Sequence, residues 1–114
     1  MNDLHCAETW ADTVAIVSAN GDVDLLTAPQ LRDAVMAALE QRPTGLIIDF
    51  SEVAFLGSAG MEVLIDTHRG LPPSVRLAVV ADGPVTSRPL QIVGLADTLD
   101  VVPTRDAALD AVGA

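Results

Sequence analysis

The chain has 114 residues, with six basic against sixteen acidic side chains and a formal net charge of -10 at pH 7. That length suits one domain with one hydrophobic core, and such a charge repels the phosphate backbone of nucleic acids. No apolar run approaches the roughly 20 residues that cross a bilayer, and "MNDLHCAETW" at the start lacks the pattern of a leader. We therefore expect residues 1–114 to form a single cytoplasmic domain that binds neither nucleic acid nor membrane.

The first third predicts a hairpin followed by a helix. Residues 13–19, "TVAIVSA", are β-branched and apolar, as in a strand. The Asn20-Gly21 pair that follows favours a tight turn, with a short second strand after it. Thr27 is the expected N-cap of the helix, with Pro29 in its first turn and Gln30 at the third position of a capping box. Its apolar residues recur at helical spacing, at Leu31, Ala34, Val35, Ala38 and Leu39.

The middle of the chain predicts a buried strand and a second helix. Residues 45–50, "GLIIDF", form an apolar run without alternation, which is typical of a strand covered on both faces. A second helix is expected to begin at Ser58 and to end at Gly70, ahead of two prolines. Its expected inward positions are Met61, Leu64, Ile65 and His68.

The last third repeats the alternation of strands and helices. Strands are expected at 75–81 and 99–103, with a helix at 84–95 that Pro89 distorts and Gly94 ends. Thr104 is the expected N-cap of a closing helix with Asp106 in its first turn and Ala108, Leu109 and Val112 facing inward. Such an order requires a largely parallel sheet. We expect an α/β fold with a mixed, mostly parallel sheet of about five strands and about four helices.

The sequence does not favour an enzyme. The nucleophile elbow G-x-S-x-G needs a glycine two residues before Ser58, where Leu56 stands. His68 lies ten residues further along the same predicted helix, roughly 15 Å from Ser58 along its axis. Phosphate-binding and dinucleotide-binding glycine motifs are absent from the sequence. No catalytic residue and no cofactor are therefore expected.

Metal binding is not expected either. Asp22, Asp24 and Asp49 are the carboxylates that one could combine into a metal cluster, but they fall at predicted turns and strand ends, where such groups usually face solvent or cap a helix. Cys6 has no cysteine partner and is given no role.

Ser58 is the residue that the pattern singles out. It follows a central strand, at the carboxyl edge where α/β sheets place their sites. One interpretation is an N-cap that accepts hydrogen bonds from the first helical turn. The other is a phosphorylation site, because the free N–H groups and positive end of a helix favour a phosphate. The two interpretations are compatible.

Three stretches resemble the STAS domain of bacterial anti-sigma-factor antagonists. "NGDVDLLTAPQL" is similar to the family's segment that leads into its first helix, and "GLIIDFSEVAFLGSAGMEVL" resembles its signature strand, serine loop and helix. "VVADGPVTSRPLQIVGLADTLDVVPTRDAAL" is similar to its closing half. The resemblance covers nearly the whole chain and implies a STAS-like fold.

The resemblance implies a partner switch. The unphosphorylated domain would bind an anti-sigma factor that is also a serine kinase and so release a sigma factor, and phosphorylation of Ser58 would end the complex. The resemblance implies that the partner-binding residues are Asp22, Asp24, Thr27, Gly57, Ser58, Ala59, Gly60, Met61 and Glu62.

Two residues depart from the family's signature. Gly57 stands where the family has an aspartate, and Ala59 where it has a serine or threonine. The loss of a carboxylate beside Ser58 removes a negative charge and gives the loop more backbone freedom. Two alternatives therefore stay open: a small-molecule or nucleotide-binding STAS module that uses the same loops, and a scaffold that binds its partner without phosphorylation.

Overall fold

The computed structural model describes residues 3–113, which form five strands and five helices. In chain order these are β1 (Leu4–Ala11), β2 (Val14–Val23), α1 (Ala28–Glu40), β3 (Gly45–Leu56), α2 (Ser58–Gly70), β4 (Arg76–Val80), α3 (Ser87–Ile92), α4 (Leu95–Thr98), β5 (Asp100–Val102) and α5 (Arg105–Ala111). The expected α/β fold is confirmed, with two short helices in place of the one expected at 84–95. None of the helices within residues 3–113 has the length and hydrophobicity of a membrane-spanning segment.

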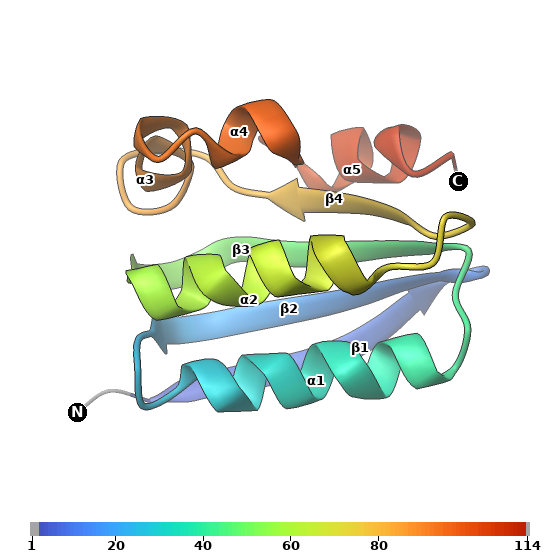
Figure 1. The fold of residues 1–114 in the computed structure, drawn as a ribbon, viewed down its shortest axis with the longest axis horizontal. Coiled ribbons are helices and arrows are strands. Elements are labelled where there is room, and N and C mark those ends of the chain that lie inside the picture. The colour runs from blue at the N-terminus through green and yellow to red at the C-terminus, as the bar shows by residue number, and fades with distance from the viewer. Residues whose placement is uncertain (1–2, 114) are drawn as a thin grey trace.

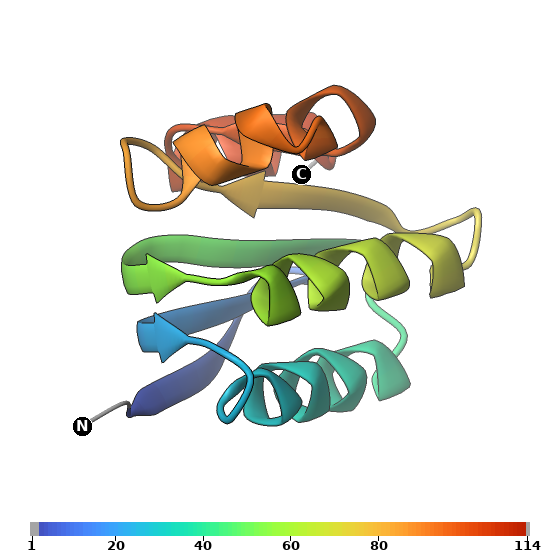
Figure 2. The ribbon, with the colours of Figure 1, turned by 60° about the vertical axis from the view of Figure 1, so that its left-hand side comes forward.

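The five strands lie in one sheet in chain order, β1-β2-β3-β4-β5. β1 pairs antiparallel with β2, and the remaining neighbours are parallel. Because each parallel strand lies directly beside the previous one, right-handed crossovers place the connecting helices on one face of the sheet. Figures 1 and 2 show α1 and α2 side by side on that face.

Each face of the sheet has its own hydrophobic core. The larger core includes Leu31 and Val35 of α1, Val63 and Leu64 of α2, and Leu90 of α3, packed against the strands. A smaller core lies on the other face, where Ala108 and Val112 pack against Val14, Ile16, Ile47, Ala78 and Val80. Both faces of β3 are thus covered, which explains its unbroken apolar run.

The hairpin differs from the sequence prediction. Its turn lies at residues 12–13, between β1 and β2, where Asp12 has a φ of 53°. Asn20 and Gly21 lie instead inside β2, which the sequence prediction ended too early. Gly21 does have a positive φ, 120°, but a Cβ there would collide with the backbone carbonyl oxygen of Asp3. Glycine is therefore required by this φ and by the close approach of the chain before β1, inside a strand and not in a turn.

Helix ends follow the sequence only in part. The side chain of Gln30 does not complete a capping box, because the N–H of Thr27 donates to Oδ1 of Asp24 at 3.0 Å. Nε2 of Gln30 donates to the carbonyl oxygen of Leu4, 2.7 Å away. Pro89 lies in the first turn of α3, where its missing N–H costs little, and Gly94 with a φ of 82° separates α3 from α4. Thr104 caps α5 as predicted, since its Oγ1 accepts from the N–H of Ala107 at 3.1 Å.

β3 is twice as long as the apolar run that predicted it. It passes beyond its last pair with β4, Asp49 with Val80, and reaches Leu56 beside β2. Two irregularities in the β2–β3 register accommodate the extra length. Because β3 extends to Leu56, Ser58 lies just beyond the carboxyl end of this strand.

The inward face of α2 was predicted in part wrongly. The fully buried positions are Gly60, Val63 and Leu64, with Met61 and Ile65 partly buried, whereas His68 is exposed. Three-residue and four-residue steps from Gly60 reach Val63 and Leu64, so a glycine, which the apolar pattern ignores, marks the true centre of the face.

Candidate functional site

The loops that follow β2 and β3 meet at the carboxyl edge of the sheet. A hollow of about 350 Å³ lies between them, lined by Asp24, Leu25, Phe55, Gly57, Ser58, Ala59 and Glu62. Five of the nine predicted partner-binding residues therefore line one surface, namely Asp24, Gly57, Ser58, Ala59 and Glu62. Leu25, from the loop after β2, and Phe55, from the end of β3, also line it.

The loop before α1 is held by a local hydrogen-bond network. Asp24 Oδ1 accepts from the N–H groups of Leu26 and Thr27, each at 3.0 Å. The hydroxyl of the buried Thr27 accepts from the N–H of Asp24 at 2.9 Å and donates to the carbonyl oxygen of Asp22 at 2.7 Å. Thr27 occupies the N-cap position of α1 as predicted, but its side chain accepts no hydrogen bond from the helix. It closes the loop instead.

The remaining predicted residues support the surface from behind. Asp22 lies at the end of β2 and contributes its carbonyl oxygen to Thr27. Gly60 is buried, and the half-buried Met61 packs against the larger core. Together with Thr27, these residues do not line the hollow.

Ser58 is the first residue of α2, and the N-cap position belongs to Gly57. Gly57 has extended backbone, with φ −92° and ψ 177°, and its carbonyl oxygen accepts from the N–H groups of Gly60 and Met61 at 3.1 and 3.2 Å. No side chain accepts a hydrogen bond at this helix end. The prediction that Ser58 caps the helix is therefore wrong, because the cap falls one residue earlier. Ser58 is exposed instead.

The two glycines beside Ser58 have different packing. A Cβ on Gly60 would lie 2.5 Å from Cγ1 of Val23 and 2.7 Å from Cδ1 of Leu56, so the helix needs glycine there to approach the strands. A Cβ on Gly57 would lie 3.1 Å from the exposed ring of Phe55 and 3.5 Å from the carbonyl oxygen of Val23. The atoms close to Gly60 belong to buried core side chains that cannot move away, whereas the ring of Phe55 beside Gly57 is exposed and can move.

The hollow has an acidic character. Asp24 and Glu62 are its ionisable lining residues, and no arginine or histidine of the described chain lines it. A phosphate on Ser58 would add nearly two negative charges to this surface. Cationic groups that could stabilise it must therefore come from elsewhere.

Asp49 lies apart from Asp22 and Asp24, on the side of the sheet covered by α5. Its nearly buried carboxylate accepts from Nη2 of Arg105 at 2.7 Å and from the N–H of Ser51 at 2.9 Å. Burial raises the pKa of Asp49, but these hydrogen bonds and the Arg105 charge outweigh it and lower the pKa overall. Residues 3–113 bring together no group of three or more histidine, cysteine, aspartate or glutamate side chains able to hold a metal ion.

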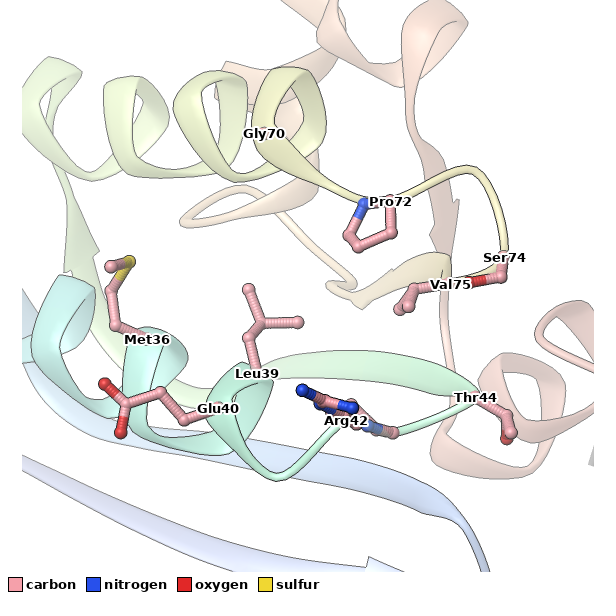
Figure 3. A pocket seen from close by; sticks show the side chains of 10 residues that line it. Met36, Leu39, Glu40, Arg42, Thr44, Gly70, Pro72, Ser74 and Val75 are labelled. Atoms are coloured by element: carbon pink, nitrogen blue, oxygen red, sulfur yellow. The ribbon is translucent and has the colours of Figure 1, made fainter.

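A second hollow lies near the C-terminal ends of α1 and α2. Its volume is about 610 Å³, and Met36, Leu39, Pro43, Pro72 and Val75 are among its lining residues. Figure 3 shows Met36 and Leu39 rising from α1 on one side, with Pro72 and Val75 on the other. It shares no lining residue with the hollow beside Ser58.

Comparison with known proteins decides the family. The profile of the STAS domain matches residues 9–108. The chain belongs to the STAS domain family. This STAS domain is 41% identical over 99 residues to the anti-sigma-F factor antagonist RsfB of Mycobacterium tuberculosis, covering 87% of this chain and 81% of the relative.

Solved structures agree with the STAS assignment. A crystal structure of an anti-sigma factor antagonist from Mycobacterium paratuberculosis superposes with a TM-score of 0.93 at 40% identity, covering 96% of this chain and 94% of that one. The phosphorylated form of the Bacillus cell fate determinant SpoIIAA superposes with a TM-score of 0.69 at 20% identity, covering 93% and 97%. At that lower identity the likeness concerns the fold alone.

Leu25, Leu26 and Phe55 were not singled out from the sequence. These residues are 80%, 82% and 52% exposed. Leu25 and Leu26 directly precede the predicted N-cap, and Phe55 falls in the stretch that was expected to be a loop. The sequence did contain one signal: Leu25 and Leu26 are adjacent apolar residues that fit neither helical nor strand periodicity, which indicates exposed apolar side chains in a loop.

Proposed function

We propose that this STAS domain is an anti-sigma-factor antagonist whose binding to an anti-sigma factor is switched off by phosphorylation of Ser58. The observation that carries the proposal is the position of Ser58: an exposed hydroxyl at the first residue of α2, in an acidic hollow built from two loops. The names of two relatives at 41% and 40% identity support the choice of partner.

The switch rests on charge. In its neutral state the loop presents Gly57, Ser58 and Ala59, small residues that let a partner approach closely. A phosphate in the same place must be desolvated or find a cation when the partner binds. Asp24 and Glu62 line the same hollow and repel it further. A loss of about 1.4 kcal/mol already weakens binding tenfold, and burial of a phosphate without a compensating cation costs more than that, so one phosphate on Ser58 weakens the complex by more than tenfold.

In this proposal the anti-sigma factor is also the serine kinase, and its capture by the unphosphorylated domain releases a sigma factor. The test is to incubate the protein with candidate anti-sigma kinases and ATP and to map the modified residue by mass spectrometry. Label at Ser58 is expected. Label elsewhere, or none with any cognate kinase, would contradict the proposal.

Gly57 and Ala59 favour the scaffold alternative, in which the partner binds without phosphorylation, because both depart from the family's signature. Equal affinity before and after kinase treatment would support it. The hollow of about 610 Å³ in Figure 3 favours a small-molecule alternative, but at a place other than the serine loops to which the sequence analysis assigned it. A thermal-shift screen with nucleotides and small metabolites tests it, since a ligand of the folded state raises the melting temperature.

A further inference from the structure

The hollow beside Ser58 has apolar side chains displayed to solvent around it. Leu25 and Phe55 line it, and Leu26 follows Leu25 on the same loop. At 80% and 82% exposure, the two leucines are largely open to solvent. Isolated apolar residues on a surface are common, but three around one hollow form a patch of the kind that marks binding sites.

The two leucines are also held in place. Asp24 Oδ1 accepts from the N–H of Leu26, and the hydroxyl of Thr27 closes the loop over Asp24 and Asp22. The N–H of Ala28 donates to the carbonyl oxygen of Asp24 at 2.8 Å. A loop fixed at both ends loses little entropy when a partner covers it. Leu25 and Leu26 are thus presented in advance of binding.

The apolar patch is bordered by negatively charged side chains. Glu62 and Asp24 line the hollow with the apolar residues, and the whole chain carries a net charge of -10. A partner with complementary chemistry has an apolar side chain at the centre of its surface and arginine or lysine at the periphery. A phosphate on Ser58 would stand between the two, where it blocks the apolar contact.

We propose that Leu25 and Phe55, with Leu26 beside them, are the apolar anchors of this domain for an anti-sigma factor that inserts an apolar side chain into the hollow and sets cationic side chains against Glu62. This inference rests on the proposed function and adds the chemistry of the partner. Of the three anchors, Phe55 falls within the stretch that resembles the family's signature strand, serine loop and helix. Leu25 and Leu26 lie outside that stretch, in the loop before α1. The serine then controls access to anchors that lie around it.

The test is titration calorimetry of the purified domain against its cognate anti-sigma factor, with Leu25→Gln, Leu26→Gln and Phe55→Gln. Each variant is expected to weaken binding about tenfold or more, as for residues at the centre of an interface. The matched control is Met36→Gln, an apolar residue that is 57% exposed and lines the hollow shown in Figure 3, where less than a twofold change is expected. Circular dichroism and melting curves verify that each variant folds.

A salt titration tests the charged rim. Glu62→Gln is expected to reduce the salt dependence of binding, whereas Leu25→Gln leaves that dependence unchanged. If the wild type binds and Ser58 phosphorylation ends binding, but the leucine and phenylalanine variants bind like wild type, the anchor proposal is overturned and the proposed function stands. If the wild type fails to bind any anti-sigma factor of its organism, both are overturned.

Discussion

A Cβ atom on Gly57 would lie 3.1 Å from Cε2 of Phe55, which places the residue that departs from the family's signature against one of the proposed anchors. The backbone of Gly57 does not require glycine, since its φ of −92° and ψ of 177° are open to any residue. The exposed ring of Phe55 needs to move by only a few tenths of an ångström to admit a side chain.

Gly57→Asp is expected to stabilise the domain slightly. Gly57 is the N-cap of α2, and aspartate accepts hydrogen bonds from the first turn and interacts favourably with the helix dipole. The expected gain is about 0.5 kcal/mol, measured as an increase in the urea midpoint. Gly57→Ala is the control, because it adds the same Cβ without an accepting oxygen and should lower the midpoint. A loss of stability in both variants would mean that contact with Phe55 dominates.

Gly60→Ala is expected to destabilise the domain by about 1–2 kcal/mol, because overpacking exceeds the gain in helix propensity. Its Cβ would lie 2.5 Å from Val23 and 2.7 Å from Leu56. Gly70→Ala, at the other end of the same helix, meets nothing within 4 Å and should be neutral or stabilising. Urea denaturation of both proteins gives the comparison, and equal stabilities would refute the close packing of α2 on β2.

Thr27→Val is expected to cost about 1–3 kcal/mol, because the N–H of Asp24 and the carbonyl oxygen of Asp22 lose their partner at a buried position. Thr27→Ser retains the hydroxyl and should recover most of that loss. Hydrogen exchange at Leu26 should also accelerate in the valine variant as the loop loosens. Unchanged exchange would show that Asp24 holds the loop without help from Thr27.

The pair of Asp49 and Arg105 predicts how stability depends on pH. Because the folded state lowers the pKa of Asp49, its contribution is present at neutral pH and above, and decreases below about pH 4, as the carboxylate becomes protonated. Arg105→Met should reduce stability by about 1–2 kcal/mol at pH 7, a modest value because the arginine is partly exposed. The loss should be smaller at pH 3. A loss that is equal at both values would contradict an ionic role for this pair.

The sequence predicted the order of the elements because apolar periodicity and caps act locally. The closing helix with its Thr104 cap and the strand that begins at Gly45 follow that rule. Contacts between segments that are far apart in the sequence could not be predicted from these local patterns. β1 is held by pairing with β2 and by Gln30, and its largely exposed sequence has little apolar signal of its own.

The strand-to-helix pattern singled out Ser58 and the resemblance implied the partner-binding residues around it, while the contacts that these residues make depended on the fold. A helix cap is decided by where the strand ends, and β3 extends to Leu56, so the cap falls on Gly57 and not on Ser58. Likewise, Leu25 and Phe55 are 30 positions apart, and the parallel pairing of β2 with β3 brings the loop after β2 and the end of β3 to one hollow.

The charge switch also predicts the behaviour of a mimic. Ser58→Asp should weaken binding to the anti-sigma factor while its circular dichroism spectrum and melting curve stay near wild type, because the side chain is exposed. Ser58→Ala is the control that removes the hydroxyl without adding charge, and it should bind like the unphosphorylated wild type. A mimic that unfolds would show that Ser58 is chiefly structural.

The central claim is tested most directly by measuring the affinity of one preparation for its anti-sigma factor before and after stoichiometric phosphorylation of Ser58. The account predicts tight binding before modification and a loss of at least about tenfold after it, recovered when a phosphatase removes the phosphate. The same affinity in both states, with the phosphate verified at Ser58 by mass spectrometry, would contradict it.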